Sequence, residues 1–212
     1  MEHDFWHRRW QENEIGFHES DVNPALKEHF TELNLKKGDA IFVPLCGKSR
    51  DVGWLLDRGL TVTGAELSDV AVKQLFDDLA LTPDIRQVGK LQRYSTGNLT
   101  IFQGDIFDLS HDVLGHIDAV YDRAALVALP EQMRQRYAAH LLTLTGCAKQ
   151  LLICLEYDQA RMDGPPFSVM ANDVRDYYQA FYTVKHLART EVQGGIKGLC
   201  PGFSVAWLLS PP

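Results

Sequence analysis

The sequence lacks the features that would assign it to a membrane or a secreted protein. No apolar run approaches the ~20 residues that a helix needs to span a bilayer. The first residues (MEHD) have neither the basic nor the apolar region of a secretory signal. The four cysteines are scattered without a Cys-x-x-Cys pair, which is typical of reduced thiols rather than of a disulfide framework or a zinc site. These absences predict a cytoplasmic protein.

The sequence also has fewer basic than acidic side chains. Lysine and arginine number 21 against 28 aspartates and glutamates, which gives a formal net charge of −7. Such a surface repels polyanions, so binding of nucleic acid or of an anionic membrane through bulk charge is disfavoured. His3 and His7 are one helical turn apart, but no third ligand follows nearby and no His-Glu-x-x-His occurs, so no metal site is predicted.

Two catalytic motifs are also missing. The sequence contains no Gly-x-Ser-x-Gly elbow of the kind that carries a serine nucleophile. Residues 47–49 (GKS) end like a phosphate-binding loop, but position 42 is Phe where that loop requires glycine. Hydrolysis of ATP or GTP is therefore not predicted.

What is present indicates one globular domain, residues 1–212, with a sizeable core. Hydrophobic residues make up 45% of the chain and charged residues 23%. Short apolar runs alternate with segments of helical spacing, and such alternation builds parallel sheets. Strands are expected at 39–43, 60–65, 117–121 and 150–155, and helices at 49–59, 68–79 and 130–146.

Three segments of the chain depart from this alternation. Residues 182–191 and 203–209 face each other across a glycine-rich connection, which predicts an antiparallel strand pair. Residues 86–102 favour a hairpin, or a strand after a loop, and residues 1–37 form a helical extension before the first strand. The predicted fold class is α/β, a doubly wound, mostly parallel sheet with an antiparallel C-terminal strand pair.

The first strand–helix turn and the end of the second strand carry the main functional signal. The turn, residues 44–49 (PLCGKS), contains only Gly47, and Glu66 follows 19 residues later at the end of a strand. An acid at that spacing accepts hydrogen bonds from the two hydroxyls of a ribose. A pyrophosphate would need several glycines there, so an adenosyl ligand without one, S-adenosylmethionine, is favoured. The alternative is that Glu66 is a solvated carboxylate at a strand end.

Two further positions are ambiguous by themselves. Ile106 with Asp105 offers an apolar wall and a polar rim for an adenine, although the same residues also suit a plain loop. Arg123, after the strand at 117–121, is either part of a structural ion pair or a cation that attracts an anionic nucleophile at the mouth of the cleft.

At several points the chain resembles the thiopurine S-methyltransferases, the bacterial branch most of all. The resemblance spans nearly the whole chain in order. It is carried by residues 6–10 (WHRRW), 16–18 (GFH), 42–49 (FVPLCGKS), 57–59 (DRG), 62–68 (VTGAELS), 104–109 (GDIFDL), 121–128 (YDRAALVA) and 164–167 (GPPF). It implies a class I S-adenosylmethionine-dependent methyltransferase with a seven-stranded Rossmann-like sheet.

The resemblance also implies a cofactor site. Trp10 would lie against the cofactor, and Leu45 would offer its backbone near the methionine portion. Glu66 would hold the ribose and Ile106 would pack on the adenine. Arg123 would lie beside both cofactor and substrate.

An acceptor site is implied in the same way. Phe17 and Pro166 would wall the pocket, and residues 1–37 would cover the active site. Because the sulfonium is already a good electrophile and acidic thiols are partly ionised near neutral pH, we expect Arg123 to act electrostatically and name no proton acceptor. The sequence departs from animal relatives at residues 191–203, which contain Lys197 but no arginine.

The predicted activity is methyl transfer from S-adenosylmethionine to the sulfur of thiopurines or of aromatic and heterocyclic thiols, by a monomer without a metal. One alternative is a methyltransferase for selenium or tellurium oxyanions or other small nucleophiles. A more distant one is an NAD-dependent oxidoreductase, which would also use Glu66 but should have the glycine-rich turn. The last is a protein that binds S-adenosylmethionine without turning it over.

Overall fold

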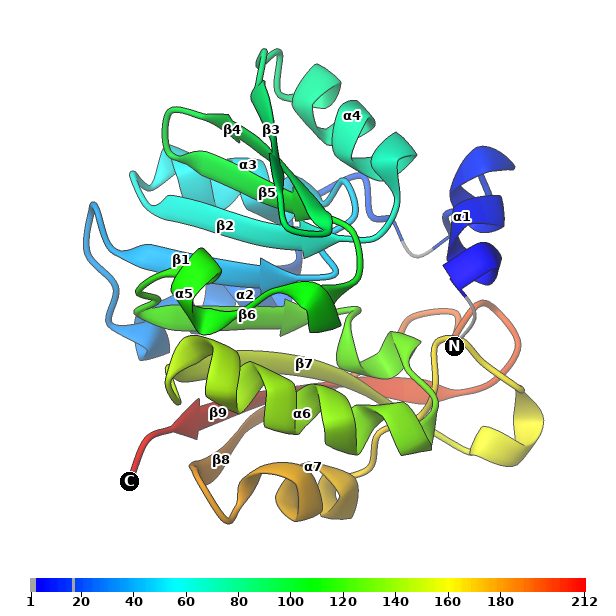
Figure 1. Ribbon diagram of the computed structural model, residues 1–212. Coiled ribbons are helices and arrows are strands. Elements are labelled where there is room, and N and C mark those ends of the chain that lie inside the picture. The colour runs from blue at the N-terminus through cyan, green and yellow to red at the C-terminus, as the bar shows by residue number, and fades with distance from the viewer. Residues whose placement is uncertain (1–2, 17) are drawn as a thin grey trace.

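A single twisted sheet, with helices packed on both faces, organises the chain in the computed structural model, which describes residues 3–16 and 18–212 (Figure 1). Within these residues the sheet has nine strands in the order β3-β4-β5-β2-β1-β6-β7-β9-β8. The strands are β1 (Ala40–Pro44), β2 (Thr61–Glu66), β3 (Asp84–Val88), β4 (Leu91–Thr96), β5 (Leu99–Gln103), β6 (Ala119–Arg123), β7 (Lys149–Tyr157), β8 (Thr183–Glu191) and β9 (Gly202–Ser210).

The pairing confirms the predicted fold class. Strands β5, β2, β1, β6 and β7 are parallel and form the centre of the sheet. Strands β9 and β8 add the antiparallel C-terminal pair, which completes the seven expected strands. The hairpin β3–β4 then extends the sheet beyond β5, so residues 84–103 contribute three strands. The count among the described residues is nine because the hairpin expected around residues 95–98 is present as β4–β5, and β3 adds a further strand before it.

Helices cover the two faces in two groups. Helices α5, α6 and α7 pack on one face, and α2, η1, α3 and α4 pack on the other. The helices are α1 (His3–Gln11), α2 (Pro24–His29), α3 (Arg50–Asp57), α4 (Asp69–Asp78), α5 (His111–Leu114), α6 (Glu131–Thr145) and α7 (Ala171–Tyr178), with short 3-10 turns η1 (Phe30–Leu33), η2 (Ile106–Asp108), η3 (Leu126–Ala128) and η4 (Gln159–Arg161). Among the described residues, none of these helices is both long and apolar enough to cross a membrane.

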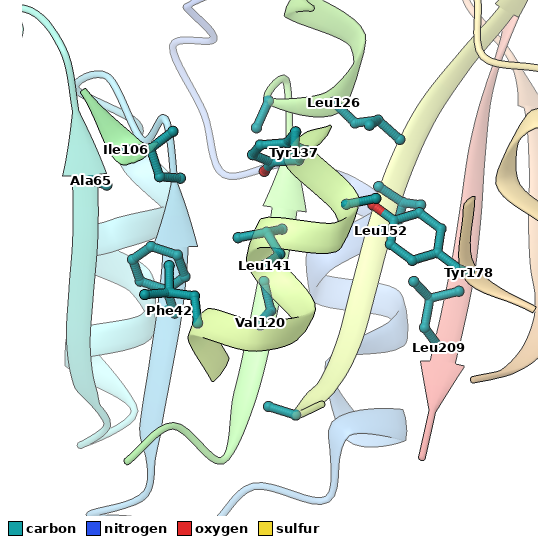
Figure 2. Close-up of a cluster of buried hydrophobic side chains, with 14 of the residues drawn as sticks. Phe42, Ala65, Ile106, Val120, Leu126, Tyr137, Leu141, Leu152, Tyr178 and Leu209 are labelled. Atoms are coloured by element: carbon teal, nitrogen blue, oxygen red, sulfur yellow. The ribbon is translucent and has the colours of Figure 1, made fainter. Parts of the chain in front are cut away.

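Strand β1 shows why the central strands have apolar side chains at successive positions. Successive side chains of a strand point to opposite faces. Phe42 enters the hydrophobic cluster under α6, whereas Ile41 and Val43 enter the cluster under α3 and α4. Figure 2 shows the first of these clusters, in which the side chains of Phe42 and Val120 point from neighbouring strands toward α6. A strand buried on both faces needs apolar side chains at every position.

Helix α6 has clear start and stop signals. Pro130 precedes its first residue, and Gly146 follows its last with φ +62°, the left-handed conformation that glycine adopts at low cost. Tyr137, Leu141 and Leu144 follow each other at intervals of four and three residues and are buried on one side of the helix. The predicted helix at 130–146 is thus present almost residue for residue.

The N-terminal extension divides into two parts. Helix α1 lies beyond the arrowheads of β2, β1 and β6, apart from the layers of the sheet (Figure 1). Helix α2 instead begins at an Asn23 cap, whose side chain accepts a hydrogen bond of 3.0 Å from the N–H of Ala25, and it buries Leu26 in the core. The first part therefore lies at the carboxyl edge of the sheet, whereas α2 packs on one of its faces.

Candidate active site

A cavity of about 650 Å³ opens at the carboxyl edge of the parallel strands. Strand β1 pairs with β2 on one side and β6 on the other, so the winding of the chain reverses here. Open α/β sheets bind their ligands at such a switch point, and ligand cavities measure roughly 300–1,000 Å³. The cavity is lined by the turn after β1, the ends of β2 and β6, the segment around η2, and α1 with the loop that follows it.

The turn after β1 reverses the chain within a few residues. Leu45 has φ +46° and Gly47 has φ +53°, both in the left-handed region. The N–H of Cys46 donates to the carbonyl oxygen of Ala65 at 3.0 Å, which ties the turn to β2. A non-glycine residue pays roughly 1–2 kcal/mol for the left-handed conformation, and such strained residues cluster at ligand sites. Leu45 lines the cavity, as expected, and its strain agrees with a functional position.

Gly47 is required for a second reason. A Cβ atom added at this position would lie 3.1 Å from Cζ2 of Trp10, closer than nearly all such contacts. The indole of Trp10 is buried and lies directly on the backbone of the turn. Helix α1 is thereby held on the turn by an aromatic ring that also lines the cavity, and the contact of Trp10 with the cofactor stays a prediction.

Glu66, at the end of β2, is buried with 6% of its surface exposed. Its Oε2 accepts a hydrogen bond of 2.8 Å from the N–H of Gly47, and its Oε1 accepts one of 2.8 Å from the N–H of Ser68. Burial raises the pKa of this carboxyl, while the two backbone donors act to lower it. Each carboxylate oxygen can accept more than one hydrogen bond, so Glu66 can hold the turn and still receive two hydroxyls from the cavity.

The segment between β5 and α5 supplies an apolar wall. Ile106 is buried and lines the cavity. Its position is fixed from two sides, because Asp105 caps η2 by accepting a hydrogen bond of 3.0 Å from the N–H of Phe107, and His140 contacts the carbonyl oxygen of Ile106 at 2.8 Å through Nε2. Asp105 also contacts Nε2 of His3 at 3.2 Å, so the expected pair of apolar wall and polar rim is present in the cavity.

Arg123 ends β6 with its side chain 14% exposed. It lines the cavity and forms an ion pair with Glu19, whose side chain is 44% exposed and which belongs to the loop between α1 and α2. Arg123 is therefore ion-paired and also faces the cavity, and its role toward an anionic nucleophile stays a prediction. Nothing near Arg123 in the sequence indicated Glu19 as its partner.

The two positions expected to wall the acceptor pocket have different outcomes. Phe17 lies outside the described residues. Pro166 lines the cavity, and its carbonyl oxygen accepts a hydrogen bond of 2.6 Å from the hydroxyl of Tyr157. Lys197 also lines the cavity and donates from Nζ to the carbonyl oxygen of Pro165 at 2.6 Å. The C-terminal loop thus meets the proline segment at the rim of the site.

Cys46 is the cysteine nearest to this chemistry, yet it is buried and unreactive. Burial, followed by the nearby charge of Glu66, raises the pKa of the thiol well above its usual value. Because the thiolate is the nucleophilic form, Cys46 stays inert at neutral pH. In the part of the chain that the structure describes, no three His, Cys, Asp or Glu side chains are grouped so that they could hold a metal ion.

Asp122, next to Arg123 in the chain, points away from the site into the core. It is fully buried, and its Oδ2 accepts a hydrogen bond of 2.8 Å from the hydroxyl of Tyr137. Burial raises the pKa of this carboxyl from the ordinary 3.8 to about 6, against the lowering effect of the hydrogen bonds from Tyr137 and from the N–H of Leu126. Ionising Asp122 therefore costs about 3 kcal/mol more in the folded protein than in the unfolded chain.

This cost predicts how stability depends on pH. Between pH 3.8 and about 6 the folded protein binds more protons at Asp122 than the unfolded chain, so the free energy of unfolding falls as the pH rises through that window. Relative to Asp122→Asn, the wild-type protein is expected to lose about 2 kcal/mol between pH 4 and pH 7.5, because part of the effect lies below pH 4. Urea unfolding across this range measures the difference. If the free energy of unfolding changes equally with pH in the two proteins, the prediction is wrong. The control is Asp112→Asn, which removes one negative charge at an exposed position on α5.

The sequence did not indicate three further residues that line the cavity, Glu19, Asn23 and Asp51. Asn23, recognised only as the start of a helix, contacts Glu19 and Asp51, and all three line the cavity. None of them belongs to a motif with a chemical meaning of its own. Their role arises from contacts between distant parts of the chain, so no local signal could have identified them.

Nearly the whole chain is similar to one family of proteins. A family model described as thiopurine S-methyltransferase matches residues 1–198. A thiopurine S-methyltransferase of Gluconobacter oxydans is 52% identical over 207 residues, which cover 98% of this chain and 94% of the relative. One from Xanthobacter autotrophicus is 52% identical over 210 residues, covering 99% of each chain.

Solved structures agree with the fold. The 1,6-didemethyltoxoflavin-N1-methyltransferase of Burkholderia thailandensis, with S-adenosylhomocysteine bound, superposes with a TM-score of 0.65 at 14% identity, covering 98% of this chain and 87% of that one. A TehB-like SAM-dependent methyltransferase of Corynebacterium glutamicum gives a TM-score of 0.59 at 14% identity, covering 99% and 98%. At these identities the likeness concerns the architecture alone.

Proposed function

The chain belongs to the thiopurine S-methyltransferase family, and on that premise we propose which of its residues carry the methyl transfer. S-adenosylmethionine is the methyl donor, and the acceptor is the sulfur of a small molecule. The activity is the one that the sequence predicts. The roles of individual residues, given next, are our proposal.

The buried carboxylate of Glu66 carries the cofactor assignment. It faces a cavity whose adjoining turn has one glycine, and it is already oriented by the N–H groups of Gly47 and Ser68. We assign it to the two ribose hydroxyls, because a carboxylate that is already fixed and desolvated loses little conformational entropy when it binds a diol. Ile106 supplies an apolar surface for the adenine, and Leu45 supplies the backbone near the methionine portion.

The remaining cavity residues suit the acceptor. The donor provides a methyl group on a sulfonium, so the protein's tasks are to align the acceptor sulfur and to exclude water. Pro166 is assigned to that space, as is Phe17 on the resemblance alone, and Trp10 on α1 is assigned to the cofactor. The guanidinium of Arg123 favours the thiolate form of the acceptor by lowering its pKa. No side chain is assigned as a proton acceptor.

The proposal includes a cover and a location. We assign α1 and the loop to residue 23 as the cover of the site, since Trp10 holds this segment on the turn after β1. The proposed oligomeric state is a monomer. The cysteines are unpaired, in keeping with a reducing compartment such as the cytoplasm.

Ligand-induced stabilisation and a transfer assay test the activity. S-adenosylhomocysteine is expected to raise the melting temperature, with about 2.7 kcal/mol of stabilisation at about 100 times its Kd, and NAD is expected to leave it unchanged. Labelled S-adenosylmethionine should then transfer its methyl group to thiopurines and aromatic thiols, with selenium and tellurium oxyanions as comparison acceptors. A shift with NAD would indicate an oxidoreductase. A shift with S-adenosylhomocysteine but no labelled product from any acceptor would indicate a binding protein.

A further inference from the structure

The ion pair between Glu19 and Arg123 changes what the acceptor site offers to a ligand. A guanidinium alone would present a full positive charge to the cavity. Here a carboxylate of the same chain contacts it, and both side chains line the cavity. The acceptor therefore meets a cation whose charge is partly offset by a carboxylate.

Glu19 is held in this position by more than its partner. Its Oε2 accepts a hydrogen bond of 3.2 Å from Nδ2 of Asn23, while its Oε1 contacts Arg123. The N–H of Asn23 donates to Oδ1 of Asp51 at 2.8 Å, and Oδ2 of Asp51 accepts from the hydroxyl of Tyr121 at 2.9 Å. Tyr121 lies on β6, two residues before Arg123, so a closed ring of contacts fixes Glu19 relative to the strand that carries its partner.

The burial of the two partners is unequal. The side chain of Arg123 is 14% exposed, whereas that of Glu19 is 44% exposed. Arg123 has lost most of its hydration and depends on a counter-charge, because an unpaired cation in that position is costly. Glu19 keeps enough contact with water to be displaced, so another anion can replace it on Arg123.

We propose that Glu19 sets the charge preference of the acceptor site by competing with anionic acceptors for Arg123. A thiol that carries an additional carboxylate must displace Glu19 or lie near its negative charge, and either costs binding energy. An uncharged thiol of the same acidity binds with the pair intact. Glu19 is thus a specificity-determining residue, and the inference rests on the proposed position of Arg123 beside the acceptor.

The test compares two acceptors that differ in charge, an aromatic thiol with a ring carboxylate and its uncharged carboxamide. In Glu19→Gln the amide oxygen can still accept from Asn23, so the loop keeps its anchor while the charge is lost. The ratio of kcat/KM for the carboxylate over the carboxamide is expected to rise roughly two- to fivefold, the upper part of the range for a partly exposed charge pair. Higher salt should reduce this gain.

Glu12→Gln is the matched control, since Glu12 is exposed on the same loop and is not among the described residues that line the cavity. It removes one charge from the protein and should leave the ratio unchanged. An unchanged ratio in Glu19→Gln would overturn the inference. A ratio that rises equally when Arg123 has already been replaced by glutamine would also overturn it, because the effect would then not pass through that pair.

The same variants separate the two proposals. If Arg123→Gln lowers turnover of the uncharged thiol while Glu19→Gln leaves the ratio unchanged, Arg123 keeps its role and only the inference about Glu19 fails. If Arg123→Gln leaves turnover of both thiols intact, the proposed role of Arg123 fails, and the competition fails with it. Circular dichroism on each variant verifies that the fold is retained.

Discussion

Replacing Glu66 with alanine is expected to weaken binding of S-adenosylmethionine and S-adenosylhomocysteine by about 1–3 kcal/mol, which is roughly five- to 150-fold in Kd. Two hydrogen bonds from the ribose would be lost at a buried carboxylate. The N–H groups of Gly47 and Ser68 would also lose their acceptor, so the turn that contacts the cofactor would lose its support from β2. Isothermal titration calorimetry with S-adenosylhomocysteine measures the effect.

Glu66→Gln separates the two contributions. Glutamine keeps one oxygen for a backbone N–H but directs an NH2 group at the other, so part of the support of the turn survives and the acceptor for one ribose hydroxyl does not. Its affinity should therefore fall between those of the wild type and Glu66→Ala. Unchanged affinity in both variants would remove Glu66 from the ribose. A loss confined to thermal stability would make it a structural carboxylate only.

The fold was predictable because its central strands are buried on both faces. Residues 39–43 are apolar at four of five positions and residues 60–65 contain no charged side chain, which is typical of parallel strands covered by helices, and both segments form strands in the structure. Strand β3 was not predicted as a separate strand, for the opposite reason. All five residues of β3 are exposed or half-buried, so the apolar alternation that marks a strand is weak there.

Some residues of the candidate site could also be predicted from the sequence, and others could not. Glu66 and Gly47 could be found because each occupies a fixed place in a strand–turn–helix unit, and the fold alone brings them together. Asp51 and Glu19 could not be found, because their positions depend on how the loop before α2 packs against β6 and α3. Such packing is determined by tertiary contacts, which a single sequence does not reveal. The backbone strain at Leu45 is equally invisible without coordinates.

Replacing Arg123 is expected to reduce turnover by roughly a hundredfold for Arg123→Gln, the typical loss when one preorganised electrostatic contact to a reacting group is removed. Arg123→Lys should retain only part of the activity. Lysine keeps the charge, but its ammonium cannot reproduce a planar fork that contacts Glu19 and an acceptor at once. The measurement is kcat/KM for an aromatic thiol in both variants.

The pH profile distinguishes this electrostatic role from a structural one. If Arg123 stabilises the thiolate, its loss raises the pKa of the bound acceptor, and the ascending limb of the profile moves to higher pH in Arg123→Gln. Thiols of lower pKa should then be affected least, because they are ionised without help. Arg189→Lys is the matched control, since Arg189 forms an ion pair with Glu156 at 2.8 Å but does not line the cavity in the described structure. A uniform loss across thiols with an unshifted profile would instead make Arg123 an anchor for the loop that carries Glu19.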